Sequence, residues 1–177
     1  MRKFARTNLR EVLRLIFETP GIRRFELSER LHMAAATVTK YVEALLRRET
    51  ILEAGDRNRY VALRMNPAWH TTLGVDIGAS ETRLVQLKAD ASVTALERFP
   101  TPAEPGRGIP ALLRHEGACD AVGIAPTAVV SPQEGRIALF ANQRSWDGYP
   151  IAALGLRKPC TLLTSGNAAA LAERQLG

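Results

Sequence analysis

Long apolar runs are missing from this sequence of 177 residues. A helix that spans a bilayer needs about 18 consecutive apolar residues, and no segment of the chain approaches that length. The basic start, MRKFARTNLR, is not followed by the apolar core and small-residue cleavage site of a secretory signal. We therefore expect a cytoplasmic protein that has no membrane among its partners.

Cysteine is equally scarce, with Cys119 and Cys160 as the two examples. They are far apart in the sequence, and neither has a Cys or His neighbour at the spacing of metal ligands. This pattern favours reduced thiols in the core over a disulfide or a metal site. We expect neither a metal nor a cofactor.

An excess of charge of one sign is absent from most of the chain. Residues 67–177 hold ten Arg and Lys against ten Asp and Glu, whereas residues 1–66 hold fourteen against eight. The whole net charge of +6 therefore lies in the first third. Such a concentration is a candidate electrostatic footprint for nucleic acid, although a solvated basic surface would look the same without a supporting motif.

The first third supplies such a motif. Residues 8–17 are predicted to form an amphipathic helix that TPGI ends at 19–22. A shorter helix is predicted at 24–33, and a third begins at AAATVTKYVEALL after a break near His32. The residues expected to be buried in the second helix are Phe25, Leu27 and Leu31. The apolar stripe expected in the third is Val38, Tyr41, Val42, Leu45 and Leu46.

Two strands are predicted next, Ile51–Ala54 and Tyr60–Arg64, around the polar turn Gly55–Arg59. Helix, turn, helix and basic hairpin in this order are typical of a winged helix-turn-helix, whose second helix enters the major groove. The alternative is a protein-interaction module of three helices. Ala34 is a weak point, because it stands where Ser or Thr usually caps such a helix. The residues expected to contact DNA are Ala35, Thr37, Thr39 and Lys40 in the helix and Arg57 and Arg59 in the wing.

A new pattern begins after Pro67, so we predict domains at 1–66 and 71–177. Three strands at 72–77, 82–88 and 93–99 are separated by tight turns and form a β-meander. Short helices and strands then alternate, including a buried strand within PCTLLTS and a helix that begins at GNAAAL. This order predicts an α/β domain with a mixed sheet.

Several segments carry a resemblance to a known family. They are 8–64, LGVDIGAS (73–80), VGIAPTAVVSPQEGRI (122–137), ANQRSWDGYPIAALGL (141–156) and TSGNAAALAE (164–173). In this order they resemble the transcription-regulator branch of the ROK family of repressors and sugar kinases. The resemblance implies an N-terminal winged helix-turn-helix followed by one lobe of an actin-like ATPase fold, truncated after that lobe.

The resemblance also implies that kinase chemistry is lost. Ser165 stands where the family has its catalytic Asp, and Thr164 stands where the preceding Asn belongs. A serine hydroxyl is no general base near neutral pH unless another base activates it. We therefore expect no catalytic residue. Asn142 matches a sugar-contacting Asn of the family, but we favour a turn-capping role for it.

Asp76, Gly78 and Ser80 match the family's first phosphate turn, with Ala79 in place of its second glycine. They are either a vestigial phosphate site or the residues that close a tight hairpin, where these residue types are common. We favour the hairpin.

Together these features predict a sequence-specific regulator that binds double-stranded DNA and represses carbohydrate-related genes. A homodimer is expected, because the helix at AAALAERQL exposes apolar surface and two-fold symmetry suits paired half-sites. A sugar effector is a further candidate partner. The alternatives are a sugar kinase that phosphorylates hexoses with ATP, and a non-functional truncated fragment.

Overall fold

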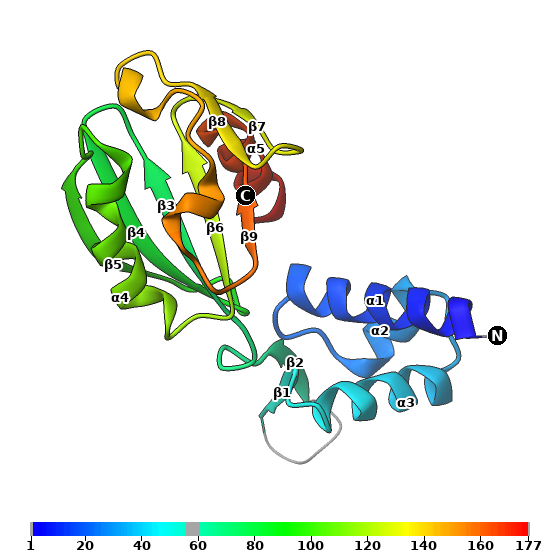
Figure 1. Ribbon diagram of the computed structural model, residues 1–177. Coiled ribbons are helices and arrows are strands. Elements are labelled where there is room, and N and C mark those ends of the chain that lie inside the picture. Colours follow the sequence, from blue (N-terminus) through cyan, green and yellow to red (C-terminus); the bar gives the residue numbers. More distant parts are fainter. Residues whose placement is uncertain (1, 56–60, 177) are drawn as a thin grey trace. The chain divides into compact units, whose positions relative to one another are not determined.

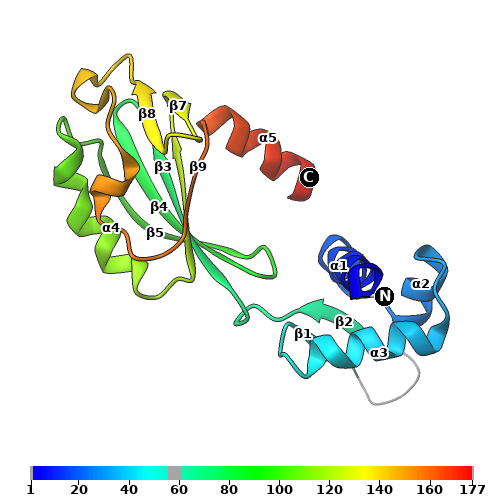
Figure 2. The same cartoon turned by 45° about the vertical axis from the view of Figure 1, so that its right-hand side comes forward.

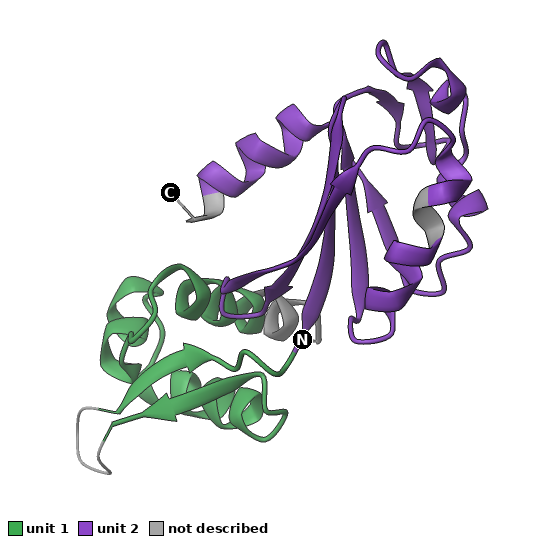
Figure 3. Ribbon diagram, turned by 90° about the vertical axis from the view of Figure 1, so that its left-hand side faces the viewer, with its two compact units in different colours: residues 1–69 green, residues 70–177 purple. Residues whose placement is uncertain are grey.

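The computed structural model describes residues 2–55 and 61–176. The chain divides into two compact units, Met1–Trp69 and His70–Gly177 (Figure 3). Within the described residues, no helix is both long enough and apolar enough to cross a membrane.

The first unit contains three helices, α1 (Arg2–Glu18), α2 (Arg24–Arg30) and α3 (Ala35–Leu46) (Figure 1). All three predicted helices are present. The first begins earlier than the predicted residue 8, since no glycine or proline interrupts the segment before it. One side of each helix packs into a shared core. The fully buried side chains of that core are Val12, Ile16, Ile22, Leu27, Val38, Val42, Ile51 and Leu63.

The burial predicted for α2 is right at Leu27 and wrong at Phe25. Leu27 is fully buried, Leu31 is partly buried, and Phe25 is 52% exposed. Successive residues turn by about 100° around a helix, so Phe25 lies about 200° away from Leu27. A helix of seven residues buries one face, and Phe25 therefore faces outward.

The wing is a two-stranded antiparallel sheet of β1 (Ile51–Ala54) and β2 (Ala62–Met65). It is extended by Ile22, which forms a bridge with Leu63. The Gly21 N–H donates to the Leu63 carbonyl at 2.9 Å, and the Leu63 N–H donates to the Ile22 carbonyl at 2.8 Å. Gly21 has φ of 92°, a conformation that favours glycine. The TPGI segment therefore ends α1 and also joins the wing to the helices.

The second unit is built on a five-stranded mixed sheet in the order β5-β4-β3-β6-β9. Its strands are β3 (Thr71–Ile77), β4 (Glu81–Lys88), β5 (Val93–Pro100), β6 (Ala121–Pro126) and β9 (Cys160–Leu162). The meander β3-β4-β5 is antiparallel, whereas β6 and β9 add parallel strands. The predicted α/β fold with a mixed sheet is confirmed.

The remaining elements cover this sheet. They are η1 (Pro105–Gly108), α4 (Ile109–Glu116), the hairpin of β7 (Val129–Ser131) and β8 (Arg136–Leu139), η2 (Arg144–Trp146), η3 (Ile151–Leu154) and α5 (Ser165–Leu176). Figure 2 shows α4 and α5 on opposite sides of the sheet. The main core includes Leu73, Val75 and Ile77 of β3 and Leu112 of α4. The face of the sheet toward α5 carries the alternate residues of β3.

The segment PCTLLTS is not the buried strand that its apolar residues predicted. Among the described residues, its strand, β9, pairs with β6 alone and forms an edge of the sheet. Leu162 is buried, but Cys160 and Thr161 are exposed. Cys160 is therefore not a core thiol, while Cys119 is. An edge strand is covered on fewer sides than a central strand, and the local sequence does not reveal which position a strand takes.

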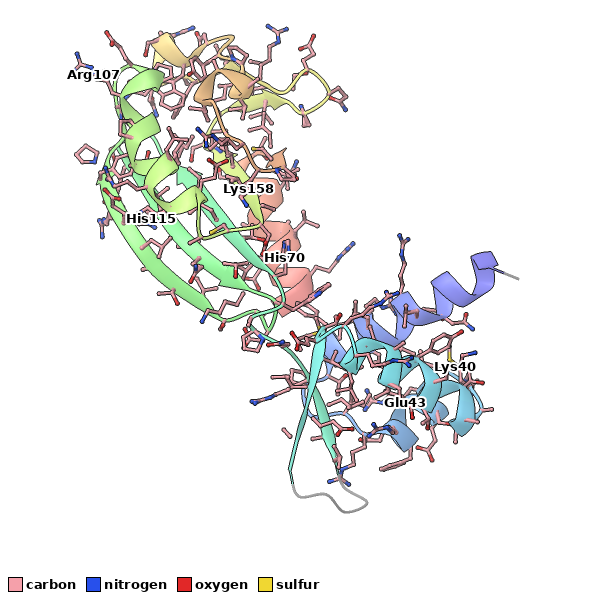
Figure 4. All side chains as sticks on the ribbon, turned by 60° about the horizontal axis from the view of Figure 1, so that its bottom comes forward. Lys40, Glu43, His70, Arg107, His115 and Lys158 are labelled. Carbon is pink, nitrogen blue, oxygen red and sulfur yellow. The ribbon has the colours of Figure 1, made fainter. Side chains whose placement is uncertain are left out.

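A cluster of charged side chains joins β5 to α4. The Arg114 guanidinium donates to the Glu97 carboxylate at 2.8 Å, and His115 Nε2 lies 3.1 Å from the same carboxylate (His115 is labelled in Figure 4). The hydrogen bond with His115, and next the one from Arg114, hold the pKa of Glu97 below its ordinary value. Because the folded state binds this proton less tightly than the unfolded state, ionised Glu97 stabilises the fold.

We expect this stabilisation to be present above the unfolded pKa and to be lost as the pH falls through the lower, folded pKa. In the Glu97→Gln variant the decrease in stability as the pH falls through the ordinary carboxylate range and below it should therefore be smaller than in the wild type. Urea denaturation at a series of pH values measures this difference. Glu173→Gln, on the exposed part of α5, is the matched control. Parallel pH profiles for wild type and Glu97→Gln would contradict the assignment.

Candidate nucleic-acid interface

The turn between α2 and α3 is held by its own hydrogen bonds. The Ser28 hydroxyl donates to the Met33 carbonyl at 2.5 Å, and the Met33 N–H donates to the Ser28 carbonyl at 3.0 Å. His32 adopts a left-handed conformation with φ of 50°, which reverses the chain after α2. These bonds fix the short break that a helix-turn-helix requires between its two helices.

The burial of α3 determines which face it presents. Val38, Val42 and Leu45 lie in the core. About half a helical turn away lies a line of exposed residues with the spacing i, i+4, i+7, i+11. We call this line the outer stripe; its members are Ala36, Lys40, Glu43 and Arg47. A duplex approaching α3 from outside would meet these side chains first.

The residues predicted to contact DNA are distributed over this face. Ala35 and Lys40 are exposed, and Thr37 and Thr39 are half-buried on the flanks of the outer stripe. Arg57 and Arg59 lie outside the described residues. Three members of the outer stripe were not among the residues predicted to contact DNA: Ala36, Glu43 and Arg47. Counting helical turns forward and back from Lys40 places all three on the same face.

The start of α3 is uncapped, as its sequence predicts. Ala34 occupies the N-cap position and provides no side-chain hydrogen bond. The first N–H groups of a helix lack partners within the helix and carry a partial positive charge. Residues 34, 35 and 36 are exposed alanines, whose own small side chains leave this end of the backbone accessible.

An ion pair connects the wing to the helices. Arg24 at the start of α2 and Glu53 on β1 form a salt bridge of 2.5 Å. The pair is partly exposed, so its contribution to stability is small, but it links the two elements that flank α3. Among the described residues, no salt bridge engages Lys40 or Arg47. Their charges are therefore available to a polyanion.

Backbone N–H and carbonyl groups of the β3–β4 turn form hydrogen bonds within the second unit. The Gly78 N–H donates to the Glu81 carbonyl at 2.9 Å, and the Thr101 hydroxyl donates to the Gly78 carbonyl at 2.8 Å. The Thr101 N–H donates to the Ser80 carbonyl at 2.9 Å. Asp76 lies on β3 opposite Arg83 of β4. This geometry is that of a closed hairpin tied to the end of β5.

The residues at the start of α5 are engaged in capping. The Thr164 hydroxyl accepts a hydrogen bond from the Asn167 N–H at 3.2 Å, as an N-cap residue does. Ser165 donates to the Thr127 hydroxyl at 3.4 Å. A hydroxyl partner does not activate a serine as a base. Asn142 is exposed in the turn that follows β8.

The sheet face toward α5 forms an open groove of about 450 Å³. One row of residues in register crosses the middle of the groove, and its members are Val85, Gly74, Gly123 and Thr161. Two adjacent glycines leave this row without side chains that would fill the groove. The lining is mainly apolar, with Asp76 and Arg83 among its polar side chains.

The first unit resembles a known family of domains. Residues 6–51 match the family described as winged helix-turn-helix DNA-binding. No curated protein sequence matches the chain. The first unit is therefore a winged helix-turn-helix domain, formed by α1, α2, α3 and the β1–β2 hairpin.

Solved structures share the fold of the chain. A ROK family transcriptional regulator, a homologue of the E. coli Mlc protein, has a TM-score of 0.68 at 18% identity, covering 98% of this chain and 49% of that one. A ROK family protein from Streptococcus pneumoniae in complex with sucrose has a TM-score of 0.54 at 17% identity, covering 59% and 38%. A ROK family glucokinase from Streptomyces griseus in complex with glucose and AMPPNP has a TM-score of 0.53 at 22% identity, covering 60% and 37%.

These similarities establish the fold. The chain has a winged helix-turn-helix followed by one lobe of the actin-like ROK fold, and the expectation of this architecture is confirmed. The chain spans about half the length of the ROK regulator.

Proposed function

We propose that the protein is a sequence-specific DNA-binding transcriptional regulator, acting as a repressor of carbohydrate-related genes. The observation that carries this proposal is the outward face of α3, which presents exposed Lys40 and, at its C-cap, exposed Arg47, on a helix that a hydrogen-bonded turn joins to α2. Bases are read by side chains on such a helix, while cations nearby hold phosphates. The net charge of residues 1–66 supports the same assignment.

Selection of bound sequences from a pool of random duplex DNA tests this function. We expect a palindromic sequence to be enriched, because paired winged helices read paired half-sites. Binding of the enriched duplex should exceed binding of a scrambled duplex by at least about 1,000-fold. A pool that stays random through repeated rounds would disprove sequence-specific binding.

A homodimer and a sugar effector are part of the proposal. Two of the exposed apolar side chains of the second unit, Val93 and Leu171, give a second copy a surface to bury. Sedimentation at micromolar concentration measures the oligomeric state directly. Glucose and sucrose, bound by solved proteins of the same fold, are the first effectors to add to the DNA-binding assay.

Sugar-kinase activity is not part of the proposed function. Ser165 stands at the position of the base that the resemblance implies, and its hydroxyl contacts Thr127 rather than a carboxylate. Incubation with ATP, Mg²⁺ and glucose should yield no phosphorylated sugar. Product formation that depends on Asp76 would restore the kinase alternative.

A further inference from the structure

Glu43 is an acidic side chain in the middle of the face proposed to meet DNA. It is exposed, follows Lys40 by three residues and precedes Arg47 by four, so the three share one side of α3. Figure 4 shows Lys40 and Glu43 on this helix.

No structural partner neutralises this carboxylate among the described residues. The salt bridges found within the described part of the first unit are Arg14–Glu18 and Arg24–Glu53, and neither includes Glu43. An ionised carboxylate brought between two phosphate backbones is repelled by both. Glu43 therefore weakens binding to DNA in general, unless a base edge donates a hydrogen bond to it.

The major groove offers two such donors, the N4 amino group of cytosine and the N6 amino group of adenine. Adenine also presents its N7 acceptor beside N6, and this lone pair repels a carboxylate. The N4 group of cytosine is flanked on its own base by a C5–H group, and this group does not repel a carboxylate. A carboxylate on the recognition helix is therefore matched best by cytosine.

We propose that Glu43 determines specificity at one C·G base pair of the bound sequence by accepting a hydrogen bond from cytosine N4. This inference rests on the proposed DNA-binding function. Lys40 and Arg47 lie on either side of Glu43 along the helix and offset its repulsion by phosphate. The same carboxylate thus penalises sequences that lack cytosine at this position.

Substitution of Glu43 should change the preferred base. Parallel selections from random duplex DNA would use the wild type, Glu43→Gln, Glu43→Ala and the control Glu11→Gln, which removes another exposed acidic charge, from α1. Glutamine forms two hydrogen bonds with adenine N6 and N7, so Glu43→Gln should replace C by A at one position of each half-site. Glu43→Ala should lose the preference there, and Glu11→Gln should enrich the wild-type sequence.

A change in the DNA gives the complementary measurement. Replacing the selected cytosine by thymine exchanges the N4 donor for the O4 acceptor. We expect this change to weaken wild-type binding by about tenfold and to leave binding by Glu43→Ala unchanged. If Glu43→Gln and Glu43→Ala enrich the wild-type sequence at every position, the role of Glu43 is disproved while the proposed function stands. If the wild type itself enriches no sequence, both fail.

Discussion

The Lys40→Ala, Arg47→Ala double variant should bind its selected duplex about 100-fold more weakly than the wild type, because each charge-assisted contact with phosphate contributes about 1.5 kcal/mol. Both side chains are exposed on the outer stripe, and neither takes part in a salt bridge among the described residues. Removing them leaves the buried stripe of α3 intact. The loss is therefore one of binding and not of folding.

Salt dependence shows whether these residues hold phosphates. Each phosphate contact releases about one counterion, so the slope of log affinity against log salt should become shallower by about two in the double variant. Fluorescence anisotropy with the selected duplex over a series of salt concentrations measures both quantities. The control is Arg10→Ala, Arg14→Ala, which removes two exposed charges from α1, one of them paired with Glu18. Equal losses in the two double variants would mean that total charge, rather than the outer stripe, governs binding.

Contacts with phosphates position a protein on DNA, whereas contacts with bases read the sequence. This distinction helps to explain the composition of α3. A helix that bound any DNA tightly would carry cations along its whole outer face, because the phosphates dominate affinity. Here alanine precedes Lys40 by one turn, and an acidic residue separates the two cations. Under the proposed function, such a face has less affinity for DNA in general and relies more on contacts with bases.

Much of this architecture follows from local sequence. The strands β3, β4 and β5 are marked by alternating side chains and separated by tight turns, so their positions were predicted within one residue at each end. The helices α1, α2 and α3 follow similarly from periodicity and from the break at TPGI. Where the hydrophobic pattern is strong and an element pairs or packs with the next element in the sequence, the local sequence is sufficient to predict that element.

The errors occur where burial depends on distant neighbours. Cys160 is exposed because β9 forms the edge of the sheet, and the sequence of this segment alone does not determine the order of the strands. Phe25 faces outward because a helix as short as α2 buries one face. The bridge between Ile22 and Leu63 joins segments far apart in sequence, so no periodicity within either one signals it.

Gly78→Ala should destabilise the second unit by about 2–3 kcal/mol, since an added Cβ overpacks a site that cannot relax. That Cβ would lie 2.7 Å from the Glu81 carbonyl oxygen, a backbone atom. The same carbonyl accepts the Gly78 N–H, and Thr101 donates to the Gly78 carbonyl. Any shift that relieves the clash therefore weakens the bonds that close the β3–β4 turn.

Substitutions at two other glycines provide a comparison for the loss of stability expected in Gly78→Ala. A Cβ at Gly74 would lie 2.7 Å from Cγ2 of Val85, a side-chain atom that can shift without breaking a backbone hydrogen bond, whereas a Cβ at Gly123 would meet nothing within 4 Å. We expect destabilisation to decrease in the order Gly78→Ala, Gly74→Ala, Gly123→Ala. Amide hydrogen exchange in β3 and β4 should become about 30-fold faster in Gly78→Ala, with α3 of the first unit as the internal reference.

This series also decides between the two interpretations of the turn. If Gly78 is glycine to leave room for a phosphate, an added methyl group would affect ligand binding and leave the free protein as stable as before. If it is glycine because the Glu81 carbonyl lies against it, the free protein loses stability without any ligand. The contacts across the turn favour the second result, in which Gly78 and the Ser80 carbonyl serve the fold.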